Sequence, residues 1–169
     1  MGDDLGMLVI RLAVGLMLIT HGANKVAGPG GIGGTTAWFA ALGFRPAWMH
    51  ARVAAATEIA VGVLLGLGLL TGLACAGCVG LMLVAALTDH RGKGYFIFKG
   101  GWEYVLLVAL VAIGAASVGP GAWSLDHAFG LDLAGAWWAL VAVAIGTGAA
   151  FGLLAAGYRP AAVSGGESD

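Results

Sequence analysis

Three ionisable side chains lie in the first apolar segment of this chain, residues 5–25, where a lipid-facing helix would carry none: Arg11, His21 and Lys25. On a helix, at about 100° per residue, all three fall on one side, within about 80° of each other. A histidine beside a lysine can hydrogen-bond a carbonyl group and transfer a proton to it. Because an ionisable side chain inside a membrane segment indicates a functional site, we expect this stripe to face protein or enclosed water.

A carboxylate lies at a matching depth in the second apolar segment. Glu58 is about 12 Å along a helix from His50, at the start of that segment. The first two segments are antiparallel neighbours by connectivity, so Glu58 can pair with His21 or with Lys25. The alternative is a neutral Glu58 that hydrogen-bonds only to the backbone or to Thr57.

Three more polar groups belong to the same side of the membrane. Asp89 and His90 close the third apolar segment, and Glu103 opens the fourth. Taken singly, each is typical of a solvated helix end. Together with the deeper residues His21, Lys25 and Glu58, they form what we call the polar cluster. In it we expect His21 and Glu58 to handle protons and Lys25, Asp89, His90 and Glu103 to bind a ligand, with Arg11 as a further ligand-binding residue nearer the other side.

The polar cluster does not have the spacing of a metal site. Histidines and carboxylates are suitable ligands for a transition metal, but no two of them follow the E-x-x-H or H-x-x-x-H spacing of helical metal sites. We therefore expect no metal. A pocket for the carbonyl of a quinone needs a histidine and a carboxylic acid within hydrogen-bond reach, and the cluster could supply both.

Composition defines the elements that must position these groups. The chain has 169 residues, of which 60% are hydrophobic and 10% charged, and a mean hydropathy of +0.94. A water-soluble globular domain could not carry this composition on its surface. We predict an all-α integral membrane bundle, and a net charge of −1 without a basic cluster excludes nucleic acid as a partner. Five apolar runs are long enough, or nearly so, to span a bilayer: 5–24, 53–70, 72–88, 103–117 and 134–157.

The basic residues predict the orientation. Seven of the eight Lys and Arg residues lie in the loops 25–52 and 91–99 or at Arg159, which share one side if all five runs span. The positive-inside rule then places the N-terminus outside and the C-terminus in the cytoplasm of a cell-membrane protein. Asp3 and Asp4 begin the chain where a signal peptide would be basic, so we expect the first segment to be retained.

The loop after the first helix contains two distinct stretches. Residues 28–34, GPGGIGG, have the glycine content of a phosphate cradle but not the P-loop Lys-Ser/Thr, so a hinge or turn-rich linker is expected. Residues 35–44 carry an aromatic patch that predicts either an interfacial anchor helix or a lid over a lipid-soluble ligand. Pro46 is expected in the first turn of the next helix.

Cys75 and Cys78 form a C-x-x-C motif at the start of the third span, on the outer side. At a helix N-terminus this motif is the arrangement of a thiol–disulfide centre, but buried membrane cysteines usually act as small hydrophobic residues. Two cysteines make no disulfide framework. Arg11 lies toward the same side, where it either favours a thiolate or hydrogen-bonds to carbonyls at a neighbouring helix end.

Glycine pairs four residues apart predict close helix packing. These pairs, Gly62/Gly66, Gly68/Gly72 and Gly148/Gly152, also offer faces for a homo-oligomer. The outer loop 119–132 contains Asp126 and His127, which we expect in a solvated cap.

Several of these motifs occur in an order that resembles the DoxX family. The pattern consists of Arg11, Gly15 and H-G-x-x-K in the first helix, Glu58 before a glycine-rich end, His90, Glu103 and G-P-G-x-W-S-L-D in the outer loop. The resemblance covers residues 5–127. It implies a four-helix membrane bundle related to the membrane subunit of thiosulfate:quinone oxidoreductase and to other redox-linked membrane proteins.

The chain departs from that family in its last segment and in its cysteine motif. We expect a four-helix bundle over 1–130, an added transmembrane helix over 131–157 and a polar cytoplasmic tail over 158–169. The CAGC motif is not part of the family pattern. The predicted function is a quinone-interacting component of a redox system that works with a soluble redox partner, since the sequence has no flavin, haem or iron–sulfur motif. The alternatives are a non-catalytic membrane anchor or assembly subunit and a small-molecule transporter.

Overall fold

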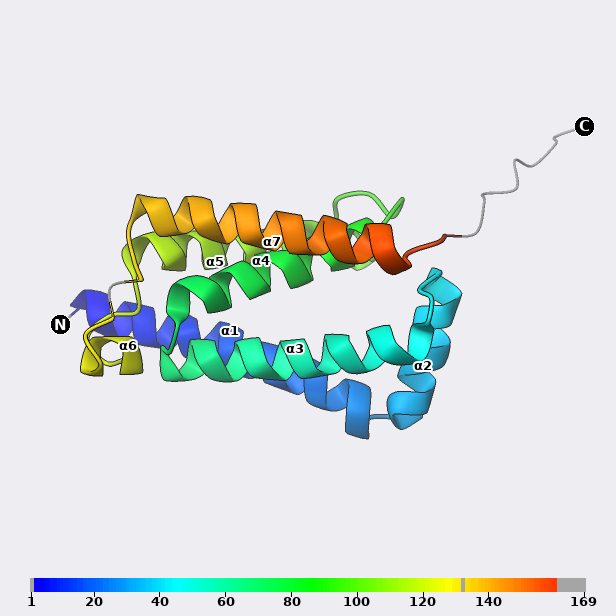
Figure 1. Cartoon of the computed structure of the whole chain (residues 1–169), viewed down its shortest axis with the longest axis horizontal. Coiled ribbons are helices and arrows are strands. Elements are labelled where there is room, and N and C mark those ends of the chain that lie inside the picture. Colours follow the sequence, from blue (N-terminus) through cyan, green and yellow to red (C-terminus); the bar gives the residue numbers. More distant parts are fainter. Residues whose placement is uncertain (1, 132, 161–169) are drawn as a thin grey trace, which may run out of the picture.

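The computed structural model describes residues 2–131 and 133–160, and in this part of the chain every regular element is a helix (Figure 1). The predicted all-α fold is therefore confirmed. Three short helices connect the long ones: α2 (Gly31–Leu42), the 3-10 helix η1 (Ile97–Lys99) and α6 (Leu125–Ala128). The long helices are α1 (Gly2–Ala27), α3 (Ala47–Leu67), α4 (Thr71–Leu87), α5 (Glu103–Val118) and α7 (Ala136–Gly157).

Three of the long helices are long and apolar enough to cross a membrane. They are α1, α3 and α7, with 26, 21 and 22 residues. The other two, α4 and α5, are apolar but have only 17 and 16 residues. At 1.5 Å per residue they are about 26 and 24 Å long, somewhat less than a hydrocarbon core of about 30 Å. The fourth apolar run, 103–117, thus corresponds to the shortest of the five long helices.

One local expectation was wrong near α2. The stretch 28–34 is not a linker throughout, because α2 already begins at Gly31, and only 28–30 form the turn. The next helix begins at Ala47, so Pro46 marks its start as expected, but as the N-cap residue and not within the first turn. Here a glycine-rich composition suggested a loop, but contacts with the rest of the bundle stabilise a helix.

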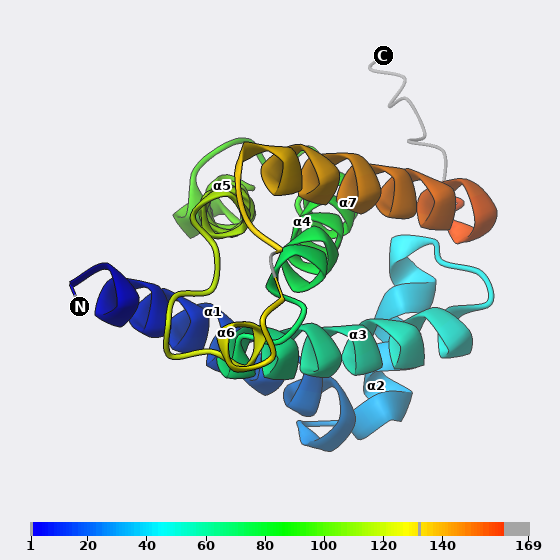
Figure 2. The same cartoon turned by 60° about the vertical axis from the view of Figure 1, so that its left-hand side comes forward.

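The bundle has two layers, with α1 packed along α3 and with α4 packed on α5 and α7 (Figure 2). Backbones come very close in the first layer. A Cβ atom added to Gly15 would lie 2.6 Å from the carbonyl oxygen of Gly62, and one added to Gly62 would lie 2.6 Å from the carbonyl oxygen of Gly15. Glycine at both positions thus allows α1 and α3 to touch along their backbones.

This contact predicts a matched pair of variants. Gly62→Ala should lower the free energy of unfolding by about 1–3 kcal/mol, because its Cβ has no room against α1. Gly148→Ala on α7, where nothing lies within 4 Å of the added atom, should be neutral or slightly stabilising. Unfolding in detergent micelles measures both values. Equal effects of the two substitutions would contradict the α1–α3 contact.

The two layers are joined by the α3–α4 hairpin, which opens like a V. Its turn consists of residues 68–70, and we call it the outer turn, after the side of the membrane on which the sequence predicts it. From this turn α4 diverges from α3 toward the end of the molecule where α2 lies (Figure 1). The space between the layers is therefore narrow at the outer turn and wide at the α2 end.

Helix α2 crosses the wide end, and the loop after it is attached to the end of α7. The backbone N–H of Arg45 donates to the carbonyl of Gly157, and that of Arg159 donates to the carbonyl of Gly43, each at 2.8 Å. Phe44 and Tyr158 form an antiparallel bridge, with ring centroids 5.2 Å apart. This contact, which we call the strap, links the two layers across the wide end.

Candidate functional site

Lys25 and Glu58 form an ion pair between α1 and α3. The Lys25 Nζ donates to both carboxylate oxygens of Glu58, at 2.8 and 2.7 Å, and the two side chains are 14% and 13% exposed. Of the pairings that the sequence left open, the structure therefore has the one with Lys25. An ammonium group has three N–H donors, so one donor remains for a further acceptor.

His21 lies one helical turn before Lys25 and does not reach Glu58. Its ring lines the cavity described below. Thr57, the alternative partner of Glu58, lines the same cavity. Lys25, Glu58 and His21 thus present one ion pair and one imidazole to a common space.

Asp89 and His90 approach this space from the end of α4. The His90 Nδ1 lies 2.6 Å from the carbonyl oxygen of Gly100, and its Nε2 is 4.0 Å from a carboxylate oxygen of Asp89. That carboxylate also accepts from Lys93 at 3.3 Å. Because the Gly100 carbonyl can only accept, Nδ1 carries a proton, and Nε2 is the ring nitrogen that remains for another partner.

Glu103 is the member of the polar cluster that the structure does not bring to the cavity lining. Its carboxylate accepts from the backbone N–H of Ile97 at 3.0 Å and so fixes the loop before α5. Its neighbour Tyr104 lines the cavity instead. A difference of one residue is 100° around a helix, which sequence position alone does not resolve.

The cavity occupies the opening of the V and has a volume of about 740 Å³. Its polar lining is gathered at the α2 end, where Lys25, Glu58, Asp89 and His90 lie. Toward the outer turn the lining becomes apolar and follows α4 as far as Leu73, which is about 22 Å from Thr88 at helical rise. The apolar limb of the cavity is lined by Leu73, Ala76, Gly77, Gly80, Leu81, Ile145 and Ala149.

The aromatic patch of 35–44 covers the wide end of the cavity. Phe39 and Phe44 are buried, their ring centroids are 5.0 Å apart, and both line the cavity together with Trp38 and Leu42. An anchor helix would turn these side chains to lipid. Phe39 and Phe44 therefore face the cavity, whereas Trp38 is 42% exposed, and both the anchor and the lid stay predictions.

His50, near the start of α3, also lines the cavity, although its type and spacing did not lead us to expect a site residue there. It is 6% exposed, its ring centroid is 5.1 Å from that of Phe44, and its Nε2 has no hydrogen-bond partner among the described residues. Since His50, Thr57 and Glu58 are seven and eight residues apart, helical periodicity places them on one face. This spacing in the sequence could have identified His50 as a residue on the same face as Glu58.

At the other end of the molecule, Arg11 and Asp126 hold the outer turn together. Arg11 is 1% exposed, and its Nη2 donates to the carbonyl of Trp123 at 2.5 Å. Asp126 is fully buried and accepts from the backbone N–H groups of Leu70 and Thr71, at 2.7 and 2.8 Å. The expected solvated cap was therefore wrong for Asp126, because its carboxylate satisfies the first N–H groups of α4.

Glycine is required at position 68 for two reasons. Its φ of 62° is left-handed, and an added Cβ would collide with the guanidinium of Arg11. The carbonyl of Gly68 also accepts from the backbone N–H of Asp126 at 2.8 Å. Arg11 thus hydrogen-bonds a carbonyl, as one interpretation expected, although this carbonyl belongs to the outer loop.

Cys75 and Cys78 are free thiols with exposed fractions of 0%. Both belong to the apolar core between the layers. A soluble thiol partner would reach them only after the helices had separated, so the redox interpretation remains a prediction.

No group of three or more His, Cys, Asp and Glu side chains within residues 2–131 and 133–160 is arranged to hold a metal ion. The chemistry that the site offers is hydrogen bonding and proton transfer, beside an apolar limb. These properties suit an amphiphilic ligand with a polar ring or head.

Comparisons with known proteins agree with the sequence pattern. The DoxX family profile matches residues 6–91. The chain is 32% identical over 123 residues to "Putative oxidoreductase CatD" of Bacillus subtilis, covering 73% of this chain and 86% of that protein. It is 31% identical over 133 residues to an uncharacterized membrane protein of Mycobacterium tuberculosis, covering 72% of this chain and 79% of that protein. No solved structure matches the chain.

Proposed function

Because this chain belongs to the DoxX family of membrane proteins, and is a membrane redox-associated protein, we propose that it binds a quinone as a component of an oxidoreductase system. The observation that carries the proposal is one cavity with a polar end and an apolar limb. A prenylated quinone has the same two parts, a ring with carbonyl oxygens and a long hydrocarbon tail. The cavity therefore suits the chemistry of the ring and of the first part of the tail.

The polar end would hold the ring. Lys25 keeps one N–H donor free beside its pair with Glu58 and can donate it to a quinone carbonyl. His90 lies on the opposite layer, and because its Nδ1 donates to the Gly100 carbonyl, it would donate to the ring from Nε2 only with its imidazole protonated. We assign proton handling at that end to His21 and Glu58, and Glu58, which is ionised in its pair with Lys25, would have to take up a proton before it could pass one on.

A bound quinone would accept two electrons and two protons. The electrons are assigned to a soluble redox partner, because the sequence contains no flavin, haem or iron–sulfur motif. The partner would meet the side that carries the basic loops, which the positive-inside rule places in the cytoplasm, with the N-terminus outside the cell membrane. Gly148 and Gly152 on α7 have open space beside them, which supports a homo-oligomer through that face.

Retention of quinone tests the proposal. Protein purified in mild detergent should retain menaquinone or ubiquinone, detected by extraction and chromatography, and added quinone should raise its melting temperature. Ala149→Phe, in the apolar limb, should lower retention of a prenylated quinone about tenfold or more but leave binding of tail-free menadione intact. Ala144→Phe, exposed on the same helix and outside the cavity lining, is the matched control.

The competing function is a non-catalytic membrane anchor. The observation that favours it is the Lys25–Glu58 ion pair, which can hold α1 and α3 together without any ligand. An anchor predicts that replacing His21 and Glu58 together by apolar residues leaves partner recruitment intact. Protein that retains no quinone, and whose melting temperature does not respond to menaquinone or ubiquinone, would exclude our proposal in favour of the anchor. The transporter alternative needs a polar path from His21 to Arg11, and Arg11 does not line the described cavity.

A further inference from the structure

A second groove, of about 600 Å³, lies on the outside of the α4–α5–α7 layer. It runs between the end of α4, the loop that follows it and the last turns of α7. Only His90 lines both this groove and the central cavity. The inference drawn from the groove therefore goes beyond the proposed function and does not depend on it.

The rim of the groove carries an unpaired cation. Arg91 lines the groove and is exposed. Among the described residues, no side chain or carbonyl accepts from its guanidinium, whereas nearby Lys93 is paired with Asp89. No Asp or Glu of the described chain lines the groove. The rim is thus complementary to an anion.

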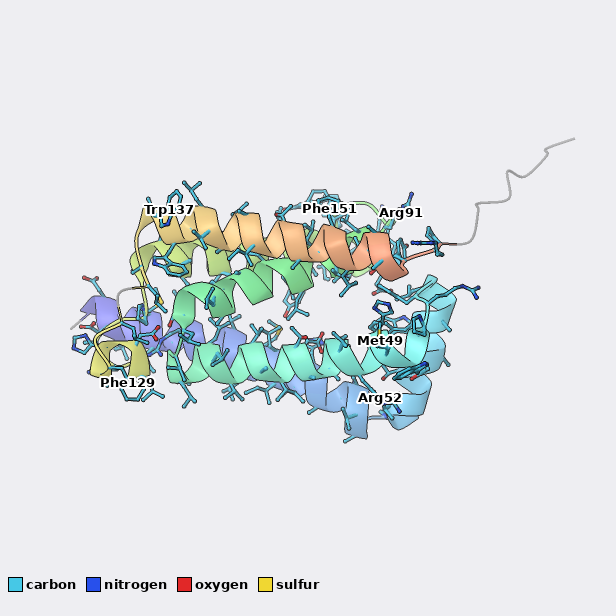
Figure 3. The ribbon with its side chains drawn as sticks, in the orientation of Figure 1. Met49, Arg52, Arg91, Phe129, Trp137 and Phe151 are labelled. Carbon is cyan, nitrogen blue, oxygen red and sulfur yellow. The ribbon has the colours of Figure 1, made fainter. Side chains whose placement is uncertain are left out.

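The wall below this rim is apolar. Leu87 from α4 and Phe151 and Leu154 from α7 line it, and Phe151 is 54% exposed. Figure 3 shows Arg91 and Phe151 close together on the same face, at the end of α7. In a bilayer such a face is covered by lipid, so an acyl chain along Phe151 would bring a head group to Arg91.

Two amphipathic aromatic residues lie between the Arg91 rim and the apolar wall, at the level expected for the boundary between lipid head groups and acyl chains. Trp102 and Tyr158 line the groove at its polar end. The Trp102 ring is oriented by an edge-on contact with Tyr95, with centroids 5.0 Å apart. Trp and Tyr prefer the boundary between acyl chains and head groups, where their polar atoms can donate to ester and phosphate oxygens.

We propose that this groove binds an anionic phospholipid, with the phosphate on the Arg91 guanidinium and an acyl chain along Phe151 and Leu154. A guanidinium has five N–H donors in a planar fork that matches the oxygens of a phosphate. The apolar wall selects a lipid over a free phosphate ester. The negative charge of the head group selects phosphatidylglycerol over a neutral or zwitterionic lipid at the same site.

Native mass spectrometry of the full chain tests this site. The protein, released from detergent, is titrated with phosphatidylglycerol or with phosphatidylcholine of the same acyl chains. The wild type should bind phosphatidylglycerol at least about fivefold more tightly, and Arg91→Gln should remove that preference. Phe151→Ala should weaken both lipids.

Arg52→Gln is the matched control, because Arg52 is an exposed cation at the same end of the molecule but on the opposite face (Figure 3). It should leave the lipid preference unchanged. Equal losses in the Arg91 and Arg52 variants, or equal binding of the two lipids by the wild type, would overturn the proposal. Displacement of phosphatidylglycerol by soluble glycerol phosphate would also overturn it, by showing that the groove takes a free phosphate ester.

Discussion

Replacing Arg11 by Met should lower the free energy of unfolding by about 3–5 kcal/mol. Arg11 is buried, donates to the carbonyl of Trp123 and attracts the buried carboxylate of Asp126. Without its guanidinium, the Asp126 charge remains buried with only two backbone N–H groups to oppose it. Unfolding in mixed micelles, followed by circular dichroism, measures the loss.

The coupling between these two groups can be measured separately. Asp126→Asn removes the charge but keeps only one of the two acceptor oxygens, so the double variant Arg11→Met/Asp126→Asn should lose about 1–2 kcal/mol less than the sum of the two single losses. Arg52→Met, on the exposed surface, should cost less than about 0.5 kcal/mol. An Arg11→Met variant as stable as the wild type would show that the outer turn does not depend on Arg11.

Replacing Lys25 by Met should weaken quinone binding about tenfold or more and cost about 2–4 kcal/mol of stability. The substitution removes the N–H donor assigned to the quinone carbonyl. It also leaves the Glu58 carboxylate, which is 13% exposed, without its partner. Quinone titration in nanodiscs gives the first effect, and unfolding in micelles gives the second.

A second substitution separates binding from stability. In Lys25→Met/Glu58→Leu both charges are gone, so stability should return to within about 1 kcal/mol of the wild type while quinone binding stays weak. Lys93→Met is the control, because the Lys93–Asp89 pair is more exposed and should contribute at most about 0.5 kcal/mol. If quinone binding recovered in the double variant, the ion pair would be a fastener only, as the anchor function requires.

Much of the site could be predicted because depth in a membrane follows from position along a helix. Lys25 and Glu58 lie at comparable depth from the same side of the first two helices, and these helices are neighbours by connectivity. The structure pairs them at 2.7 Å. The choice between His21 and Lys25 depended on their depth, because the two lie on the same side of α1 but one helical turn, about 6 Å, apart. Helix rotation separates Glu103 from Tyr104, because a difference of one residue moves a side chain by about 100°.

The outer turn could not be predicted, because its partners are distant in sequence. Asp126 caps a helix that begins 55 residues earlier, and Arg11 reaches a carbonyl 112 residues away. Such contacts depend on how the loop crosses the bundle. Local composition indicated a solvated cap there, since aspartate and histidine in a glycine-rich loop usually face water.

By itself the sequence determined that this is a helical membrane protein, where its apolar helices run and which charged groups share a depth, because hydropathy and helical rise are local properties. Only the tertiary structure decided that α3 and α4 diverge, that α2 and the strap cover the opening and that the polar groups line one cavity with an apolar limb. Those features arise from packing between segments far apart in the chain, where shape and helix rotation determine which side chains meet.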